Sequence, residues 1–354
     1  MKAVLRRQII RQLNRAGVFS RVAQTKWRQR RLLVLCYHGI SLDDEHLCDP
    51  RMFFSAEAFR ARLELLRKWE CSVLPLGEAL EQLKRNQLPA RSVAITFDDG
   101  TCDFYQRAVP LLQDFGYPAT VYLTTFYSGR SVPVFPMAVA YVAWRGQSRA
   151  VDARELISGD LGSCDLRVTA QRDRLVMAFV EHANHRGLSA DAKTELLARF
   201  ADLVGVDFDD IRRRRILQIM KAEEVAAVSS AGFSVELHTH RHRTPEDRGL
   251  FLREIADNRN AIASMTGKTP THFCYPSGIH KPAFVPWLQE AGVVSATTCA
   301  PGLASDASDP MVLPRFVDRS PVSGEEFEAW ITGVATIFPR LRRLLVPGSV
   351  YGEA

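Results

Sequence analysis

The chain has 354 residues, of which 46% are hydrophobic and 24% charged, enough for one large globular domain or two small ones. Its net charge is +6, and the segment before Asp43 holds many lysines and arginines but no acidic residue. Seven cysteines, an odd number without regular spacing, fit a reducing compartment better than a disulfide framework. There is no secretory leader pattern and no bilayer-spanning apolar run. We therefore expect a cytoplasmic protein that can be held on the inner face of the membrane.

Residues 1–30 predict a basic amphipathic helix. Leu5, Ile9, Ile10 and Leu13 share one helical face, and arginines fill much of the rest. Two interpretations stay open: a solvated helix packed on the domain, or an interfacial helix lying on anionic lipid. No basic stripe with interleaved aromatic residues follows, so we expect no nucleic-acid partner.

Residues 31–320 alternate predicted strands with predicted helices. The first strand, 32–37, is an unbroken apolar run, as expected for a strand buried on both faces of a sheet. Further strands are expected at 71–76, 93–97, 119–123, 233–237, 271–275 and 295–298, and helices at 57–69, 76–86, 104–115, 221–230 and 245–265. This alternation is typical of a parallel sheet or barrel.

Two segments depart from this alternation. Residues 130–215 predict helices, which we interpret as an insertion between two barrel strands and not as an independent domain. Residues 321–354 predict an amphipathic helix that Pro339 kinks. Its stretch 327–345 combines an apolar side with arginines, so it either caps the barrel or shares membrane docking with residues 1–30.

Two strand ends carry the residues with the most chemistry. One predicted strand ends in the adjacent carboxylates Asp98 and Asp99, and a later one ends at His238, with His242 four residues on. One carboxylate with two imidazoles forms a plausible three-ligand site for a catalytic divalent metal, with positions left open for water and substrate. The spare carboxylate is then placed for a general base. This combination indicates hydrolysis.

The residues alone leave alternatives open at both strand ends. An aspartate pair before Gly100 also occurs as a structural turn cap. His240 could replace one of the two histidine ligands, because alternation along an extended segment puts it on the same side as His238 and His242. Three histidines within five residues nevertheless favour a site over a lone structural histidine.

Three segments carry a family resemblance. They are TFDDG at Thr96–Gly100, HTHRH at His238–His242 and FCYPSG at Phe273–Gly278. In this order they resemble the motifs of the NodB-homology polysaccharide deacetylases, carbohydrate esterase family 4. The resemblance implies an α/β fold, an irregular (β/α)7-type barrel, here with a helical insertion and flanking terminal helices.

The resemblance also implies roles for individual residues. Asp98 matches the family's general base, and Asp99, His238 and His242 match its metal ligands. Tyr275 stands where relatives provide a backbone N–H that stabilises the oxyanion. We expect a divalent metal, zinc by ligand type, although two histidines and one carboxylate also suit iron, cobalt or nickel.

The sequence departs from the commoner family pattern at two points. Cys274 stands where an arginine usually orients the base; Arg315 is the candidate replacement, and a surface arginine after a strand is the alternative. The family's C-terminal L-x-x-H motif is missing. Tyr37-His38-Gly39-Ile40 instead resembles a circularly permuted branch that includes poly-N-acetylglucosamine deacetylases, in which an N-terminal histidine is the general acid. His38 is therefore the candidate acid, and a buried histidine that caps the first strand is the alternative.

The predicted activity is metal-dependent removal of acetyl from an N-acetylated sugar, in a polysaccharide or a lipid-linked glycan precursor. The partner is thus a carbohydrate or glycolipid. Two rival hypotheses are a deformylase or other C–N hydrolase acting on a lipid-linked amino sugar, and an inactive carbohydrate-binding homologue.

Overall fold

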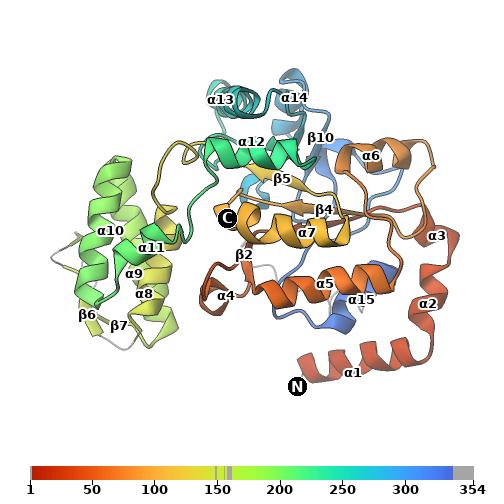
Figure 1. The fold of residues 1–354 in the computed structure, drawn as a ribbon, viewed down its shortest axis with the longest axis horizontal. Helices are drawn as coiled ribbons and strands as arrows, with labels where there is room; N and C mark the ends of the chain where they lie inside the picture. Colours follow the sequence, from red (N-terminus) through yellow and green to blue (C-terminus); the bar gives the residue numbers. More distant parts are fainter. Residues whose placement is uncertain (1, 148–149, 155, 158–161, 338–354) are drawn as a thin grey trace.

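The sheet at the centre of the molecule is parallel throughout. The computed structural model describes residues 2–147, 150–154, 156–157 and 162–337. Within these residues, seven strands pair in the order β10-β9-β8-β5-β4-β1-β11 (Figure 1). Their bounds are β1 (Leu33–Tyr37), β4 (Val93–Phe97), β5 (Thr120–Leu123), β8 (Ser234–Leu237), β9 (His272–Cys274), β10 (Ser295–Thr297) and β11 (Phe316–Val317).

One short segment joins the two edges of this sheet. Leu313 forms a parallel bridge with Thr297 of β10, and Phe316 pairs with Leu35 of β1. Between them, the Arg315 N–H donates to the Ala300 carbonyl at 2.9 Å. The sheet is therefore curled into an irregular barrel, which confirms the predicted fold class.

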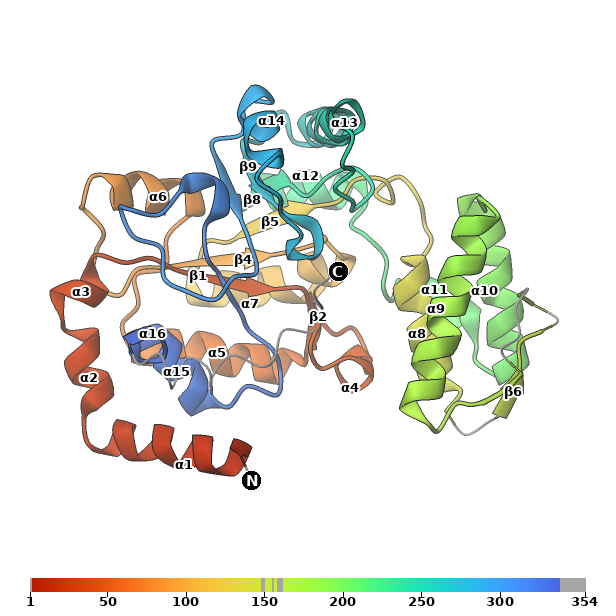
Figure 2. The same cartoon turned by 180° about the vertical axis from the view of Figure 1, so that it is seen from behind.

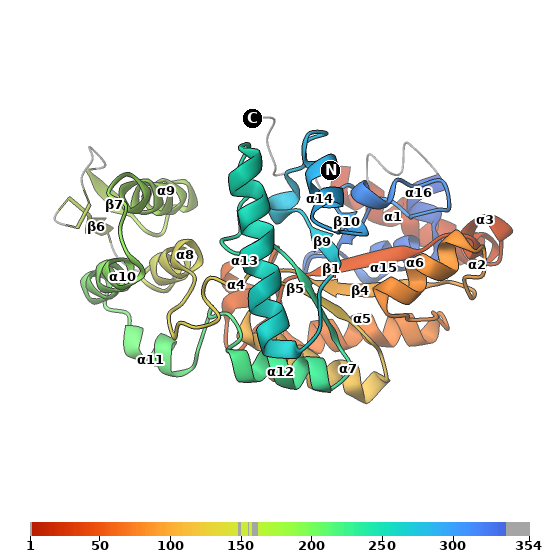
Figure 3. The ribbon, with the colours of Figure 1, turned by 90° about the horizontal axis from the view of Figure 1, so that it is seen from above.

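Helices cover the outside of the barrel, and α5, α7 and α12 lie along one side of the sheet (Figure 3). The covering helices are α5 (Ala56–Lys68), α6 (Leu76–Lys84), η1 (Phe104–Ala108), α7 (Val109–Phe115), α12 (Ala222–Ser230), α13 (Arg248–Thr266) and α14 (Phe284–Glu290). The strand predicted at 71–76 is wrong, because only Val73 forms a bridge, to Val93. Pro75 is the N-cap of α6, so the chain turns into the helix before a strand can extend.

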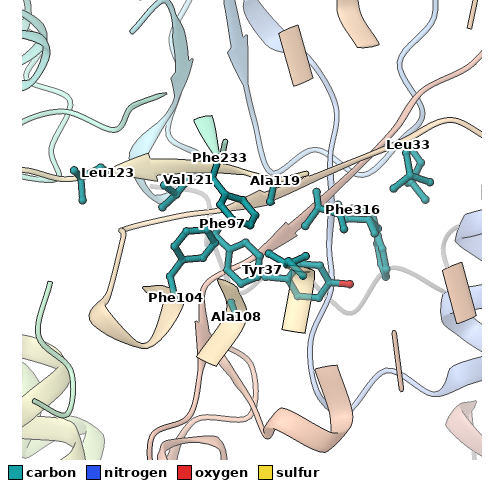
Figure 4. Packing of buried hydrophobic residues seen from close by; sticks show 14 of the residues in the cluster. Leu33, Tyr37, Phe97, Phe104, Ala108, Ala119, Val121, Leu123, Phe233 and Phe316 are labelled. Atoms are coloured by element: carbon teal, nitrogen blue, oxygen red, sulfur yellow. The ribbon is translucent and has the colours of Figure 1, made fainter. Parts of the chain in front are cut away.

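Aromatic rings fill the space between the sheet and these helices (Figure 4). The ring centroids of Tyr37 and Phe97 lie 5.4 Å apart, those of Phe97 and Phe104 4.8 Å, and those of Phe104 and Phe233 6.1 Å. All five residues of β1 and all five of β4 are buried, as expected for strands covered on both faces. This packing fixes the strand ends, where the polar residues follow.

The predicted insertion forms a lobe beside the barrel, as Figures 1 and 2 show from opposite sides. It contains α8 (Phe135–Arg145), α9 (Thr169–His185), α10 (Ala190–Val204) and α11 (Phe208–Arg213), together with an unpredicted hairpin, β6 (Ala150–Asp152) and β7 (Ser163–Asp165). The lobe has its own hydrophobic cluster, to which the barrel contributes Phe53. Arg145 and Arg214 both pair with Asp43 of the barrel.

The N-terminal segment is three short helices where one was predicted. They are α1 (Lys2–Arg15), α2 (Val18–Ala23) and α3 (Lys26–Gln29). Gly17, at a φ of 73°, breaks the first from the second. Ile10 and Phe19 are buried, and the fully buried Arg28 donates to the carbonyls of Ile331 and Ser92. Of the predicted apolar face, Ile10 is thus buried against the domain, whereas Ile9 and Leu13 are half-buried.

The predicted C-terminal helix is described as far as residue 337. The structure describes α15 (Gly324–Thr332) and α16 (Val334–Ile337), and the predicted apolar residues Phe327, Ile331 and Val334 are buried. The remaining predicted positions of stretch 327–345, with the Pro339 kink, lie outside the described residues. Among the described helices, none combines the length and the apolar character needed to cross a membrane.

A buried ion pair ties the last strand to helix α5 and yields a prediction. Arg62 Nε lies 2.7 Å from Asp318 Oδ2, and both side chains are less than a tenth exposed. The variant Arg62→Met should lose about 3–5 kcal/mol of unfolding free energy, because Asp318 is left buried without its cationic partner. The double variant Arg62→Met/Asp318→Leu should recover most of this loss. Urea denaturation measures both, and a loss under about 1 kcal/mol in the single variant would contradict the account.

Candidate active site

Asp98 and Asp99 face one pocket because the chain turns sharply after β4. The Asp98 N–H still pairs with the Tyr37 carbonyl at 2.9 Å, as part of the sheet. Asp99 has a φ of 69° and Gly100 one of 77°, both in the left-handed region. A side chain at position 100 would meet Leu123 at 2.4 Å, so only glycine fits there. The strained Asp99 is typical of a functional site.

Arg315 binds Asp98 through two parallel hydrogen bonds. Its Nη1 lies 2.7 Å from Oδ1 and its Nη2 2.8 Å from Oδ2, while its Nε donates to the Thr298 carbonyl. Arg315 is fully buried and Asp98 is 4% exposed, so the surface-arginine interpretation is wrong. Burial raises the pKa of Asp98, but the charge and hydrogen bonds of Arg315 outweigh it and hold that pKa well below its usual range.

Thiols fill the space around this ion pair. Cys36 and Cys274 each direct an S–H at Asp98 Oδ2, at 3.5 Å. The Arg315 Nη2 lies 3.1 Å from the Cys274 sulfur. The small cysteine at this position therefore leaves room for a guanidinium that arrives from the segment closing the barrel.

Three donor atoms converge on the other side of the turn. The Nε2 atoms of His238 and His242 lie 3.3 Å and 3.2 Å from Asp99 Oδ1. His238 Nδ1 lies 2.9 Å from the Cys274 carbonyl, which can only accept, so Nε2 keeps its lone pair for a ligand. These donors fit the predicted three-ligand metal site.

The charges of these groups support one another. Burial raises the pKa of Asp99, but His242 and His238 hold it well below its usual range. Burial lowers the pKa of His242, and the Asp99 charge outweighs this and raises it. The ionised Asp99 is in the state that binds a cation, and His242 must give up its proton to bind the same cation.

The third histidine of the motif lies elsewhere. His240 Nδ1 lies 2.8 Å from Thr125 Oγ1, so its ring points to the loop that follows β5. Asn258 of α13 accepts the His238 N–H at 3.0 Å and donates to Thr125. Glu254, one helical turn earlier, accepts the Arg241 N–H at 2.8 Å. Neither α13 residue is predicted from the sequence, in which their i, i+4 spacing on a helix face is the only signal they carry.

His38 stands at the end of β1, beside Asp98. One of its ring nitrogens, the Asp98 carboxylate and the Cys36 sulfur all lie within 4.8 Å of one another. Burial lowers the pKa of His38, and the charges of Asp98 and Asp99 oppose this. Its Nδ1 is buried and has no hydrogen-bond partner in the described part of the chain.

The predicted role of Tyr275 does not fit the structure. Its N–H donates to the Thr297 carbonyl at 3.2 Å, because pairing between β9 and β10 extends by one residue. The turn that follows, η2 (Pro276–Gly278), holds Ser277 at a φ of 56°. Among the described residues, the Ser277 N–H has no hydrogen-bond partner, so it is an amide that this turn leaves available.

The matched family agrees with this geometry. Residues 85–152 and 202–296 match a family model described as "Polysaccharide deacetylase". These ranges contain the Asp98–Asp99 pair, the two histidines of the three-ligand group and the Tyr275 turn. The barrel segments that carry these residues thus match the polysaccharide deacetylase family, in agreement with the resemblance found in the sequence.

Two curated relatives are similar over part of their length. The poly-beta-1,6-N-acetyl-D-glucosamine N-deacetylase of Staphylococcus aureus strain MSSA476 is 33% identical over 115 residues, 29% of this chain and 39% of the relative. The protein of the same name from Escherichia coli strain K12 is 29% identical over 101 residues, 28% of this chain and 15% of the relative. The chain thus spans well under half of either relative.

Solved structures show the same fold. The Streptococcus pyogenes deacetylase PplD, in complex with acetate, has a TM-score of 0.55 at 16% identity, over 87% of this chain and 99% of that one. IcaB from Ammonifex degensii has a TM-score of 0.52 at 17% identity, over 85% and 97%.

The separate partners of the two aspartates predict separate phenotypes. Asp99→Ala removes the one carboxylate of the three-ligand group, so the purified variant should lose its bound divalent metal. Asp98→Asn is the matched control, because Asp98 is held by Arg315, and it should keep the metal. Elemental analysis with circular dichroism checks both. A folded Asp99→Ala protein with wild-type metal content would contradict the assignment.

Proposed function

We propose that the protein is a metal-dependent hydrolase of carbon–nitrogen bonds that removes acetyl groups from an N-acetylated amino sugar. The substrate class is a polysaccharide or a lipid-linked glycan precursor. The observation that carries the proposal is the position of an ionised carboxylate, Asp98, beside a three-ligand group and a histidine, within a polysaccharide deacetylase domain. The names of the two curated relatives support N-acetylglucosamine as the sugar.

Asp99, His238 and His242 would hold the metal. A bound divalent cation supplies electrophilic activation of the acetyl carbonyl and of the attacking water. Zinc suits the donor set, and iron, cobalt or nickel suit it as well.

Asp98 takes the proton of the attacking water. Its lowered pKa keeps it ionised at neutral pH. The two oxygens differ. Oδ2 accepts from Arg315, Cys36 and Cys274, whereas Oδ1 accepts from Arg315 alone among the described residues. A carboxylate oxygen has two lone-pair sites, so Oδ1 is the atom with room for the proton.

His38 protonates the amine that leaves. A sugar amine is too basic to depart as an anion, so breaking the C–N bond needs a proton at nitrogen. The Ser277 N–H, in place of the predicted Tyr275 N–H, is the amide proposed to donate to the oxyanion.

We propose that any contact with a membrane surface runs through charged side chains of α1. Arg7 and Arg15 are exposed on α1, whereas Arg11 pairs with Glu325 and Ile10 is buried against the domain. Any contact would therefore be electrostatic, between these arginines and anionic lipid headgroups on the cytoplasmic face, and not insertion of an apolar helix face.

Acetate release tests the proposed activity directly. The purified protein with its metal should release acetate from β-1,6-linked N-acetylglucosamine oligomers. Asp98→Asn should lower kcat by about 10²–10⁴-fold, because the general base is lost, with metal content unchanged. Formate release from an N-formylated amino sugar without acetate release would favour the deformylase. Oligomer binding without either product would favour an inactive binding homologue.

A further inference from the structure

The backbone after His38 is held from two sides. Gly39 and Ile40 form the short strand β2 (Gly39–Ile40), beside β3 (Phe53–Phe54). The Gly39 N–H donates to the Met52 carbonyl at 3.1 Å on the β3 side. The Ile40 N–H points the other way and donates to Asp103 Oδ1 at 3.2 Å.

Asp103 is a buried carboxyl group without a cationic partner among the described residues. It is 2% exposed, and its other hydrogen bond comes from the Thr101 hydroxyl at 3.1 Å. Burial raises the pKa of Asp103 well above its usual value, and the charge of Glu45 adds to this. The Asp103 carboxyl group therefore acts by holding one backbone N–H and one hydroxyl in place, and not by forming an ion pair.

The same carboxyl group also limits the space at Gly39. A side chain at position 39 would meet the Phe53 ring at 2.3 Å and Asp103 Oδ2 at 3.0 Å. The peptide next to His38 is therefore confined between an aromatic ring and the Asp103 carboxyl group. Only glycine fits between them.

This confinement matters because nothing among the described residues binds the buried nitrogen of the His38 ring. Catalytic imidazoles are commonly oriented by a hydrogen bond at the nitrogen that does not react. The His38 Nδ1 has no such partner in the part of the chain that the structure describes. The place of this ring is then set by the backbone that carries it.

We infer that Asp103 is the positioning residue of His38. By holding the Ile40 N–H and filling the space beside Gly39, it fixes the backbone from which the imidazole reaches the leaving amine. The inference rests on the proposed function, in which His38 is the general acid.

The chemistry of the leaving group separates this role from a structural one. An amine needs a proton from His38 in order to leave, whereas the phenolate of an aryl acetate leaves without one. A displaced His38 should therefore impair hydrolysis of the amide and spare hydrolysis of the ester. A general loss of folded protein or of metal would lower both activities together.

The test compares Asp103→Ala, Asp103→Asn, His38→Ala and the double variant His38→Ala/Asp103→Ala. Each is assayed with N-acetylglucosamine oligomers and with 4-nitrophenyl acetate. Asp103→Ala should lower kcat on the oligomers by about 10–100-fold with little change in KM, and keep ester hydrolysis within about 2-fold. Asp103→Asn should keep most activity on both, because its amide oxygen still accepts the Ile40 N–H. In the His38→Ala background, Asp103→Ala should not lower the kcat for the oligomers any further.

Several outcomes would overturn the inference. One is an equal fall in kcat for the amide and the ester substrate. Another is a further fall in kcat when Asp103→Ala is added to His38→Ala. The third is an Asp103→Ala protein that is as active as wild type. If Asp103→Ala does not fold, Asp103→Ser replaces it, because a serine hydroxyl is too short to reach the Ile40 N–H. A wild-type protein that releases no acetate from any N-acetylated sugar defeats the proposed function and the inference with it. An active wild type with an unaffected Asp103→Ala overturns the inference alone.

Discussion

The buried ion pair between Asp98 and Arg315 is the interaction on which the rest of the site depends. Taking two charges out of water is costly, and the cost is offset here by two parallel hydrogen bonds and by further bonds from Arg315 to Thr298 and Thr96. The pair also joins β4 to the segment that closes the barrel. The residue that arrives with closure of the sheet is thus the one that keeps Asp98 ionised.

The left-handed turn at Asp99 gives two adjacent carboxylates different partners. Asp98 faces a guanidinium that cannot lose its proton, whereas Asp99 faces two imidazoles that can bind a metal. Both carboxylates stay ionised, but for different reasons, and so one can accept a proton while the other remains a ligand. His38 completes the site from the neighbouring strand β1.

Much of this arrangement could be predicted from the sequence, because parallel strands bring their carboxyl ends to one side of a barrel. That rule places Asp98, Asp99, His238 and His38 together without any structure. It says nothing of hydrogen bonds between strands, so the engaged N–H of Tyr275 was not foreseen.

The remaining differences come from tertiary packing and local backbone geometry. Arg315 reaches Asp98 only because the barrel closes and Cys274 leaves space. No local sequence pattern indicates either of these. The break at Gly17 and the short bridge at Val73 depend on single residues within otherwise regular patterns. The α13 residues Asn258 and Glu254 act through the histidine loop, to which the sequence does not connect them.

The most direct test of this account is the kcat for acetate release by Arg315→Met, measured beside its metal content. If Arg315 holds Asp98 as an ionised, oriented base, kcat should fall by at least about 10²-fold with the metal retained. Arg315→Lys should recover only part of the activity, because an ammonium group cannot form the two parallel hydrogen bonds to the carboxylate. A folded, metal-loaded Arg315→Met enzyme with wild-type kcat would contradict the account.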